Sequence, residues 1–110
     1  MSQVTTHVLD AALGKPASGV AIVFDRQADT GWLEVASAAT DSDGRVSSLG
    51  PDVLEEGIYR LTFATGDYFA ETGRMTFYPE VTILFEITGV EHYHVPILLS
   101  PFAYSTYRGS

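Results

Sequence analysis

The chain has 110 residues, a formal net charge of −8 and no cysteine, so we expect one domain spanning residues 1–110 without a disulfide framework or a thiolate nucleophile. The acidic balance argues against nucleic acid as a partner, because phosphate binding requires a basic surface. No apolar stretch approaches the roughly 18 residues of a membrane span and no secretory signal is recognisable, so we expect a cytoplasmic protein without a membrane partner.

The first half of the chain predicts short β-strands separated by turns. Residues 3–10 alternate, with Val4, Thr6 and Val8 on one face of the strand and His7 on the other. A loop with glycine and proline follows, and turns rich in aspartate and glycine separate the next apolar segments. The strands expected in this half are residues 3–10, 20–24 and 32–35, a short strand that starts at Arg45, and residues 58–63.

Residues 41–44, Asp-Ser-Asp-Gly, resemble the start of a calcium-binding loop. Such a loop requires acidic or amide side chains at alternating positions and a distant glutamate. The next alternating position is Arg45, whose positive charge opposes metal binding. An ordinary Asp-Gly turn explains the segment better, and we predict no metal site.

One helical segment interrupts the strands of the second half. Residues 67–72 can form two helical turns that Gly73 closes. The remaining strands are expected at residues 81–87, 92–99 and 103–108. Because nearly every element is a short strand, the sequence predicts an all-β sandwich.

The strand at residues 92–99 separates into two faces by parity. Its apolar face, suited to the core, consists of Tyr93, Val95, Ile97 and Leu99, and its other face of His92, His94, Pro96 and Leu98. His7 also points away from the core face of its strand. If the two strands are neighbours in one sheet, His7 and His94 share a surface. Two solvent-exposed histidines are the alternative, but the apolar residues around them favour a pocket or an oligomer interface.

This pair of histidines suggests general acid–base chemistry, because histidine titrates near neutral pH. A nearby arginine would stabilise an oxyanion or hold an anionic substrate. Metal binding is a weaker interpretation, because no suitably placed carboxylate accompanies the histidines. No serine–histidine–aspartate arrangement can be inferred from the spacing, so water is the more natural nucleophile.

Four motifs can now be considered together. They are Thr-His-Val-Leu-Asp at 6–10, Asp-Gly-Arg at 43–45, His-Tyr-His-Val-Pro at 92–96 and Tyr-Ser-Thr-Tyr-Arg-Gly-Ser at 104–110. In these motifs the chain resembles the transthyretin-related 5-hydroxyisourate hydrolases of the transthyretin-like family, and the similarity runs essentially end to end. Transthyretin itself, a hormone carrier, resembles the chain at residues 8–11 and 98–101 but lacks the histidines and the Arg-Gly-Ser ending.

The resemblance implies a transthyretin-like (prealbumin-like) sandwich of eight strands with one short helix. It implies a homotetramer with the active sites at the dimer–dimer interface, and a cofactor-free hydrolase. The implied reaction belongs to urate and purine degradation. It opens the ring of 5-hydroxyisourate to give 2-oxo-4-hydroxy-4-carboxy-5-ureidoimidazoline. The alternative from the same resemblance is a carrier that binds a small ligand in the same channel between subunits.

The resemblance also assigns roles to individual residues. His7, Arg45 and His94 are the implied catalytic group. The implied substrate-binding residues are Tyr107, Arg108 and Ser110. The resemblance selects Ser105 and Tyr107 as the outward-facing residues of the last strand. It also places Pro96 inside a sheet, which is unexpected because proline removes a donor from the hydrogen-bond ladder.

Overall fold

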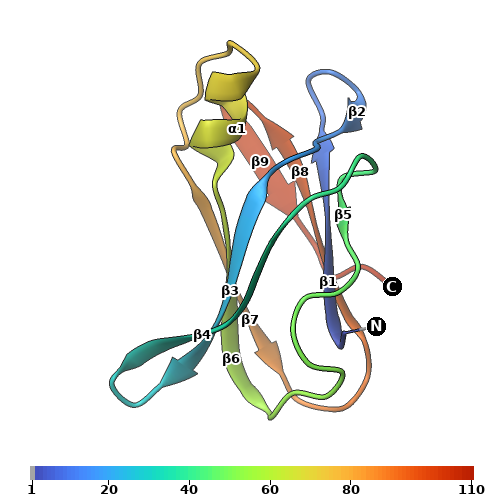
Figure 1. Ribbon diagram of the computed structural model, residues 1–110, viewed down its shortest axis with the longest axis vertical. Helices are drawn as coiled ribbons and strands as arrows, with labels where there is room; N and C mark the ends of the chain where they lie inside the picture. Colours follow the sequence, from blue (N-terminus) through green and yellow to red (C-terminus); the bar gives the residue numbers. More distant parts are fainter. Residues whose placement is uncertain (1) are drawn as a thin grey trace.

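Two β-sheets pack face to face in the computed structural model of the protein, which describes residues 2–110 (Figure 1). The elements are β1 (Val4–Asp10), β2 (Lys15–Pro16), β3 (Ala21–Ala28), β4 (Gly31–Ala39), β5 (Arg45–Val46), β6 (Gly57–Phe63), α1 (Thr65–Glu71), β7 (Val81–Ile87), β8 (Tyr93–Ser100) and β9 (Ala103–Thr106). The predicted all-β sandwich with one short helix is confirmed. The two-residue strand β2 lies in a segment that was expected to be a loop. No helix of the described residues is long and apolar enough to cross a membrane.

The order of the strands brings the two ends of the chain together. The first sheet has the order β2-β1-β8-β9, with β5 also pairing with β1, and the second has the order β4-β3-β6-β7. β1 and β8 pair in parallel, so the start of the chain and a segment near its end become neighbours. Helix α1 covers one end of the sandwich, and the hairpin of β3 and β4 extends from the other (Figure 1).

The hairpin of β3 and β4 is longer than the sequence predicted. The apolar pattern of β3 ends before the strand does. Asp25 follows the apolar segment at the point where the pairing register shifts, so the polar continuation of the strand was not predicted. Arg60 of β6 stabilises the extension. Its guanidinium lies 4.2 Å from the centroid of the Trp32 ring, and its Nε donates a hydrogen bond to Asp25 Oδ2 at 2.9 Å.

The core lies between the two sheets, on the face of β8 that parity predicted. The apolar residues of that face are all buried, namely Tyr93, Val95, Ile97 and Leu99. Aromatic side chains from the second sheet meet them, and the rings of Phe24 and Tyr59 stack with centroids 5.4 Å apart. Phe69 of α1 is also fully buried. Burial of one such side chain is typically worth about 1.5–3 kcal/mol, which ties the short helix to the sandwich.

Pro96 lies inside β8 and is buried, yet it breaks no ladder. Its carbonyl accepts a hydrogen bond from Thr106 Oγ1 at 2.8 Å. Because the nitrogen and carbonyl of one residue point to the same side of a strand, the donor-free nitrogen also faces β9. The ladder between β8 and β9 ends at the pair Ile97 and Thr106. The proline therefore sits where pairing stops, and β9 ends two residues earlier than predicted.

Candidate functional site

His7 and His94 lie on the outer face of the first sheet, as the parity of their strands predicted. β1 and β8 pair with Thr5 opposite His94 and with His7 opposite Pro96. Residues opposite each other on neighbouring strands point to the same face of a sheet. Both histidines are half-buried. The shared surface that the sequence predicted is therefore present.

Arg45 reaches the same face through β5, which pairs with β1 so that Arg45 lies opposite His7. The turn before it is built by Asp41, whose Oδ1 accepts hydrogen bonds from the backbone N–H groups of Asp43 and Arg45 at 2.9 and 3.0 Å. Gly44 has a φ of +75°, and a Cβ there would lie 2.4 Å from a backbone carbonyl oxygen of β1. Only glycine fits this position, so the Asp-Gly turn fixes where Arg45 enters the sheet.

A pocket of about 230 Å³ opens on this face and gathers residues from both ends of the chain. Its lining consists of Thr5, Thr6, Arg45, Val46, Ser47, His92, His94 and Ser110. Within residues 2–110 the guanidinium of Arg45 forms no ion pair, and His94 makes its side-chain hydrogen bond through Nδ1. The pocket therefore offers a cation and the Nε2 atom of an imidazole to a ligand.

His7 lies beside this pocket rather than in its lining. Its Nε2 lies 3.1 Å from the backbone carbonyl oxygen of Asp43. A carbonyl only accepts hydrogen bonds, so this contact places the proton of the neutral ring on Nε2 and leaves Nδ1 as an acceptor. His7 therefore lies at the border of the site, with its Nε2 hydrogen-bonded to the Asp43 carbonyl and its Nδ1 available as an acceptor.

The electrostatic surroundings of His94 favour its neutral form. Burial lowers the pKa of His94 below its ordinary value, and the positive charges of His92, Arg45 and His7 lower this pKa further. A hydrogen bond with the backbone of Thr5 acts in the opposite direction. A histidine with a lowered pKa stays neutral near pH 7, which is the form that can accept a proton. His94 is therefore suited to act as a general base.

The end of the chain returns to β8 beside His94. The N–H of Gly109 donates a hydrogen bond to the carbonyl of His94 at 2.8 Å, in a bridge that continues the register of β8 and β9 beyond Pro96. A Cβ at position 109 would lie 2.6 Å from Cδ2 of His94. Glycine therefore allows the chain to pass the ring and to bring Ser110 into the pocket.

Tyr107 and Arg108 line a different pocket from the one that holds Arg45 and Ser110. This second pocket, of about 250 Å³, lies between residues of β7 and β8 at the edge of the sandwich, and His94 lines both pockets. The guanidinium of Arg108 lies 4.5 Å from the centroid of the Tyr93 ring, a cation–π contact. The structure thus unites Arg45, His94 and Ser110, and within one chain it separates Tyr107 and Arg108 from Arg45 and Ser110 but not from His94.

The expected orientation of the last strand is correct for Ser105. This residue lies opposite Leu98, so both point to the outer face. Tyr107, which the resemblance also placed outward, follows the end of β9, is exposed and lines the edge pocket.

Two members of the site, Thr5 and His92, received no role in the sequence analysis. Thr5 Oγ1 lies 2.8 Å from Nδ1 of His94 and 2.9 Å from Nε2 of His92. The alternation of the two strands could have identified both residues. Thr5 shares the parity of His7, and His92 shares that of His94, so both belong to the outer face.

Known proteins resemble the chain over almost its whole length. The 5-hydroxyisourate hydrolase of Salmonella typhimurium is 46% identical over 108 residues, which are 96% of this chain and 79% of the relative. The solved structure of Klebsiella pneumoniae 5-hydroxyisourate hydrolase has a TM-score of 0.89 at 37% identity and covers 100% of this chain and 94% of that chain. The structure of transthyretin from Sparus aurata has a TM-score of 0.89 at 30% identity and covers 99% of this chain and 97% of that chain.

A family model describes the relationship more generally. The model of the HIUase/Transthyretin family matches residues 4–109, a range that contains β1, β8 and the bridge at Gly109. The resemblance inferred from the four sequence motifs is confirmed. The chain belongs to the HIUase/Transthyretin family.

Proposed function

We propose that this protein is an enzyme that hydrolyses 5-hydroxyisourate. The observation that carries the proposal is the pocket in which Arg45 and the neutral-form imidazole of His94 face one small volume on the outer face of the first sheet. Relatives named 5-hydroxyisourate hydrolase support the same substrate. A cyclic, polar molecule with a carbonyl next to a ring nitrogen is chemically suited to a site that combines a base and a cation.

In the proposed mechanism, Nε2 of His94 takes a proton from water, and the resulting hydroxide attacks the ring carbonyl carbon. The guanidinium of Arg45 stabilises the oxyanion that forms. The carbon–nitrogen bond then breaks, and the leaving nitrogen receives the Nδ1 proton of His7 in its imidazolium form. This transfer leaves His7 neutral, with its remaining proton on Nε2 against the carbonyl of Asp43 and its ring at the rim of the pocket opposite Arg45. No cofactor takes part in these steps.

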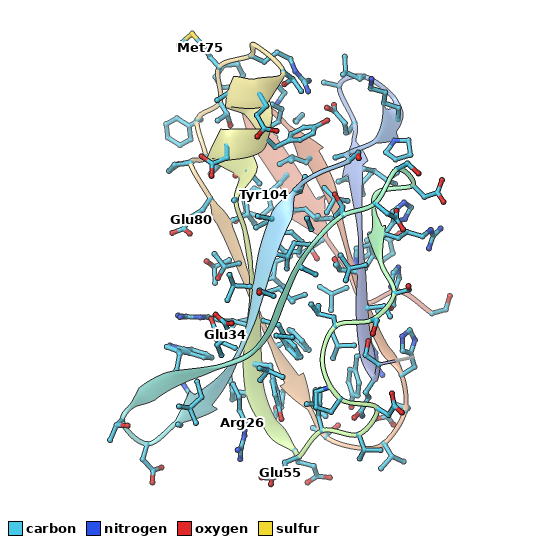
Figure 2. All side chains as sticks on the ribbon, viewed as in Figure 1. Arg26, Glu34, Glu55, Met75, Glu80 and Tyr104 are labelled. Atoms are coloured by element: carbon cyan, nitrogen blue, oxygen red, sulfur yellow. The ribbon has the colours of Figure 1, made fainter. Side chains whose placement is uncertain are left out.

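The test is an ultraviolet time course with freshly generated 5-hydroxyisourate, in which added protein is compared with spontaneous decay. The wild-type protein should consume the substrate much faster than buffer. The variants His94→Ala and His7→Ala should each lose activity by ~10²–10⁴-fold, the usual contribution of positioned acid–base catalysis. Full activity in both variants would refute the assignment. Glu55→Gln is a suitable control, because this exposed side chain pairs with Arg26 of the second sheet (Figure 2) and does not line the pocket.

The finer parts of the proposal concern the product, the location and the ligand contacts. We expect 2-oxo-4-hydroxy-4-carboxy-5-ureidoimidazoline as the product, a place in urate degradation and a cytoplasmic protein. Ser110 lines the pocket and would contact the substrate directly. Tyr107 and Arg108 would contact the substrate from the second pocket, which shares His94 with the first. Removal of either side chain should then raise KM.

We also propose a homotetramer with the active sites between dimers. Both sheets end in strands with an unpaired edge, β7 and β9, and such edges tend to pair with another chain. The outer face of β1 and β8 adds apolar area, because Leu9 and Leu98 are only half-buried there. Light scattering should give four times the 11.9 kDa mass of one chain. A monomer with full activity would contradict the shared site.

A carrier function is the second candidate, supported by a shallow hollow without charged side chains on the same face. Its lining consists of Ala11, Leu98, Ser100, Ala103, Tyr104 and Ser105. If the wild-type protein does not accelerate the decay of 5-hydroxyisourate, small aromatic ligands should be screened for binding at this hollow. Rapid turnover that depends on His94 favours the enzyme.

A further inference from the structure

The hydroxyl group of Thr5 joins two imidazole rings. Its Oγ1 lies 2.8 Å from Nδ1 of His94 and 2.9 Å from Nε2 of His92, and the two rings are nearly parallel with centroids 6.3 Å apart. Thr5 is 7% exposed, so water has little access to its hydroxyl. The hydroxyl has a single proton to donate. When both rings are neutral, one ring therefore donates to Thr5 and the other accepts from it.

This constraint couples the protonation of the two rings. If His94 donates from Nδ1 to Thr5, then Thr5 donates to Nε2 of His92, and Nε2 of His94 carries a free lone pair. If Thr5 instead donates to Nδ1 of His94, then Nε2 of His94 holds the proton and cannot act as a base. Only the first arrangement fits a base at Nε2 of His94, which must take its proton from the substrate side.

We propose that Thr5 and His92 form a proton relay behind His94, with Thr5 as a positioning residue that selects the Nδ1–H form of the resting His94 ring. When Nε2 of His94 accepts a proton, its Nδ1 proton passes to Thr5, and the hydroxyl proton of Thr5 passes to Nε2 of His92. The hydroxyl is restored, His94 ends neutral with its proton on Nε2, and the positive charge resides on His92. The catalytic use of this relay rests on the proposed hydrolase function.

The charges around the site favour this direction of transfer. His94 is half-buried and faces the positive charge of Arg45 on β5 and the ring of His7 on β1. His92 immediately precedes β8 and is exposed, so water can solvate a positive charge there. The lowered pKa of His94, which comes first from burial and then from the charges of His92, Arg45 and His7, agrees with a ring that passes its charge on.

Nitrogen-15 NMR of the histidine rings tests the relay without any assay of activity. In the wild-type protein we expect His94 to carry its proton on Nδ1 and the Nε2 of His92 to be unprotonated above the titration range of the rings. Thr5→Val removes the hydroxyl at nearly constant volume and should abolish this preference, whereas Thr5→Ser should retain it. A wild-type His94 ring with its proton on Nε2, or an unchanged tautomer in Thr5→Val, would overturn the proposal.

Activity provides the second arm of the experiment. His92→Gln keeps a hydrogen-bonding group near the position of Nε2 but cannot carry the proton. It should lower kcat by about 10-fold with little change in KM, less than the ~10²–10⁴-fold effect of a direct acid–base group. An unchanged kcat in His92→Gln would overturn the relay. This variant alters an exposed side chain, so it also tests the idea if Thr5→Val does not fold.

The two proposals can fail separately. If the wild-type protein does not hydrolyse 5-hydroxyisourate, the proposed function fails, and the tautomers of the two rings still decide whether the relay exists. If the wild-type protein is active and Thr5→Val retains both the wild-type tautomer and kcat, only the relay fails.

Discussion

β1 contributes to two polar clusters that differ in how many arrangements of donors and acceptors their hydrogen bonds allow. At its end, the carboxylate of Asp10 is fully buried and accepts hydrogen bonds from Arg74, from the hydroxyl of Tyr68 and from the backbone N–H of Leu13. Near its start, the single hydroxyl of Thr5 serves two histidine rings. The first cluster has donors for both carboxylate oxygens in one arrangement, whereas in the second the hydroxyl can accept from either ring and donate to the other.

The Asp10 cluster, called the structural cluster below, stabilises the fold. The Thr5 cluster, called the chemical cluster, is suited to proton transfer. Burial alone raises the pKa of Asp10, but the hydrogen bonds of Arg74, Tyr68 and Leu13 and the charge of Arg74 outweigh it, and the net pKa is lowered. The carboxylate therefore stays charged and fixed, and it ties α1 to the first sheet. At Thr5 the proton can move between rings at little structural cost, which suits catalysis. In this protein, the cluster whose hydrogen bonds allow two arrangements is the one that borders the pocket.

The largest expected effect comes from breaking the structural cluster. Asp10→Asn removes the charge that Arg74 pairs with in the interior. Loss of one partner of a buried ion pair typically costs about 3–5 kcal/mol. Urea unfolding should show a loss of this size in the free energy of unfolding. A loss below about 1 kcal/mol would mean that water already reaches the pair.

Gly109→Ala should have the next largest effect, and it acts on the chemical cluster. The new Cβ would lie 2.6 Å from Cδ2 of His94, so the ring must move from the position in which its Nδ1 contacts Thr5. Gly109 does not have a positive φ, so the backbone tolerates alanine and the fold should persist. A displacement near 1 Å can cost about 10²-fold in rate. The measurement is kcat together with the unfolding midpoint, and equal activity would show that the ring has room to move.

The pH dependence of stability should distinguish the two clusters, because each contributes to the free energy of unfolding over a different pH range. The lowered pKa of His94 means that the unfolded chain binds this proton more readily, so the wild-type protein loses stability as the pH falls below 6.5. His94→Gln should remove that part of the slope. The contribution of Asp10 is present above its unfolded value of 3.8 and is lost as the pH falls through its lower folded value. The stability difference between wild type and Asp10→Asn should therefore shrink only below pH 3.8.

The smallest effect is expected for an ion pair outside both clusters. Arg26 and Glu55 pair at 2.8 Å, with Glu55 78% exposed, at the opposite end of the molecule from Met75 (Figure 2). Exposed pairs contribute about 0–1 kcal/mol, so Glu55→Gln should change the free energy of unfolding by less than 1 kcal/mol. A larger loss in the free energy of unfolding would show that the difference in exposure does not explain why the Asp10 pair contributes more to stability than the Glu55 pair.

Much of the fold and part of the site could be predicted from local pattern. Alternation assigned the buried face of β8 and placed His7 and His94 on the other face, because strand periodicity is a property of neighbouring residues. The polar extension of β3 and the end of β9 could not be predicted. The first depends on Arg60 of another strand, and the second on where pairing stops at Pro96.

The strand periodicity can be read from the amino-acid sequence, as can the Asp-Gly turn before Arg45 and the motifs of the family, because these features depend on residues close together in the chain. The tertiary structure alone decided that Thr5 bridges His92 and His94, that Gly109 passes against the His94 ring, and that Tyr107 and Arg108 line a separate pocket. Each of these contacts joins segments far apart in the chain. The Thr5 bridge follows from the parallel pairing of β1 with β8. The other two contacts follow from the return of the chain end along β8 and beside β7, and no local pattern encodes these pairings.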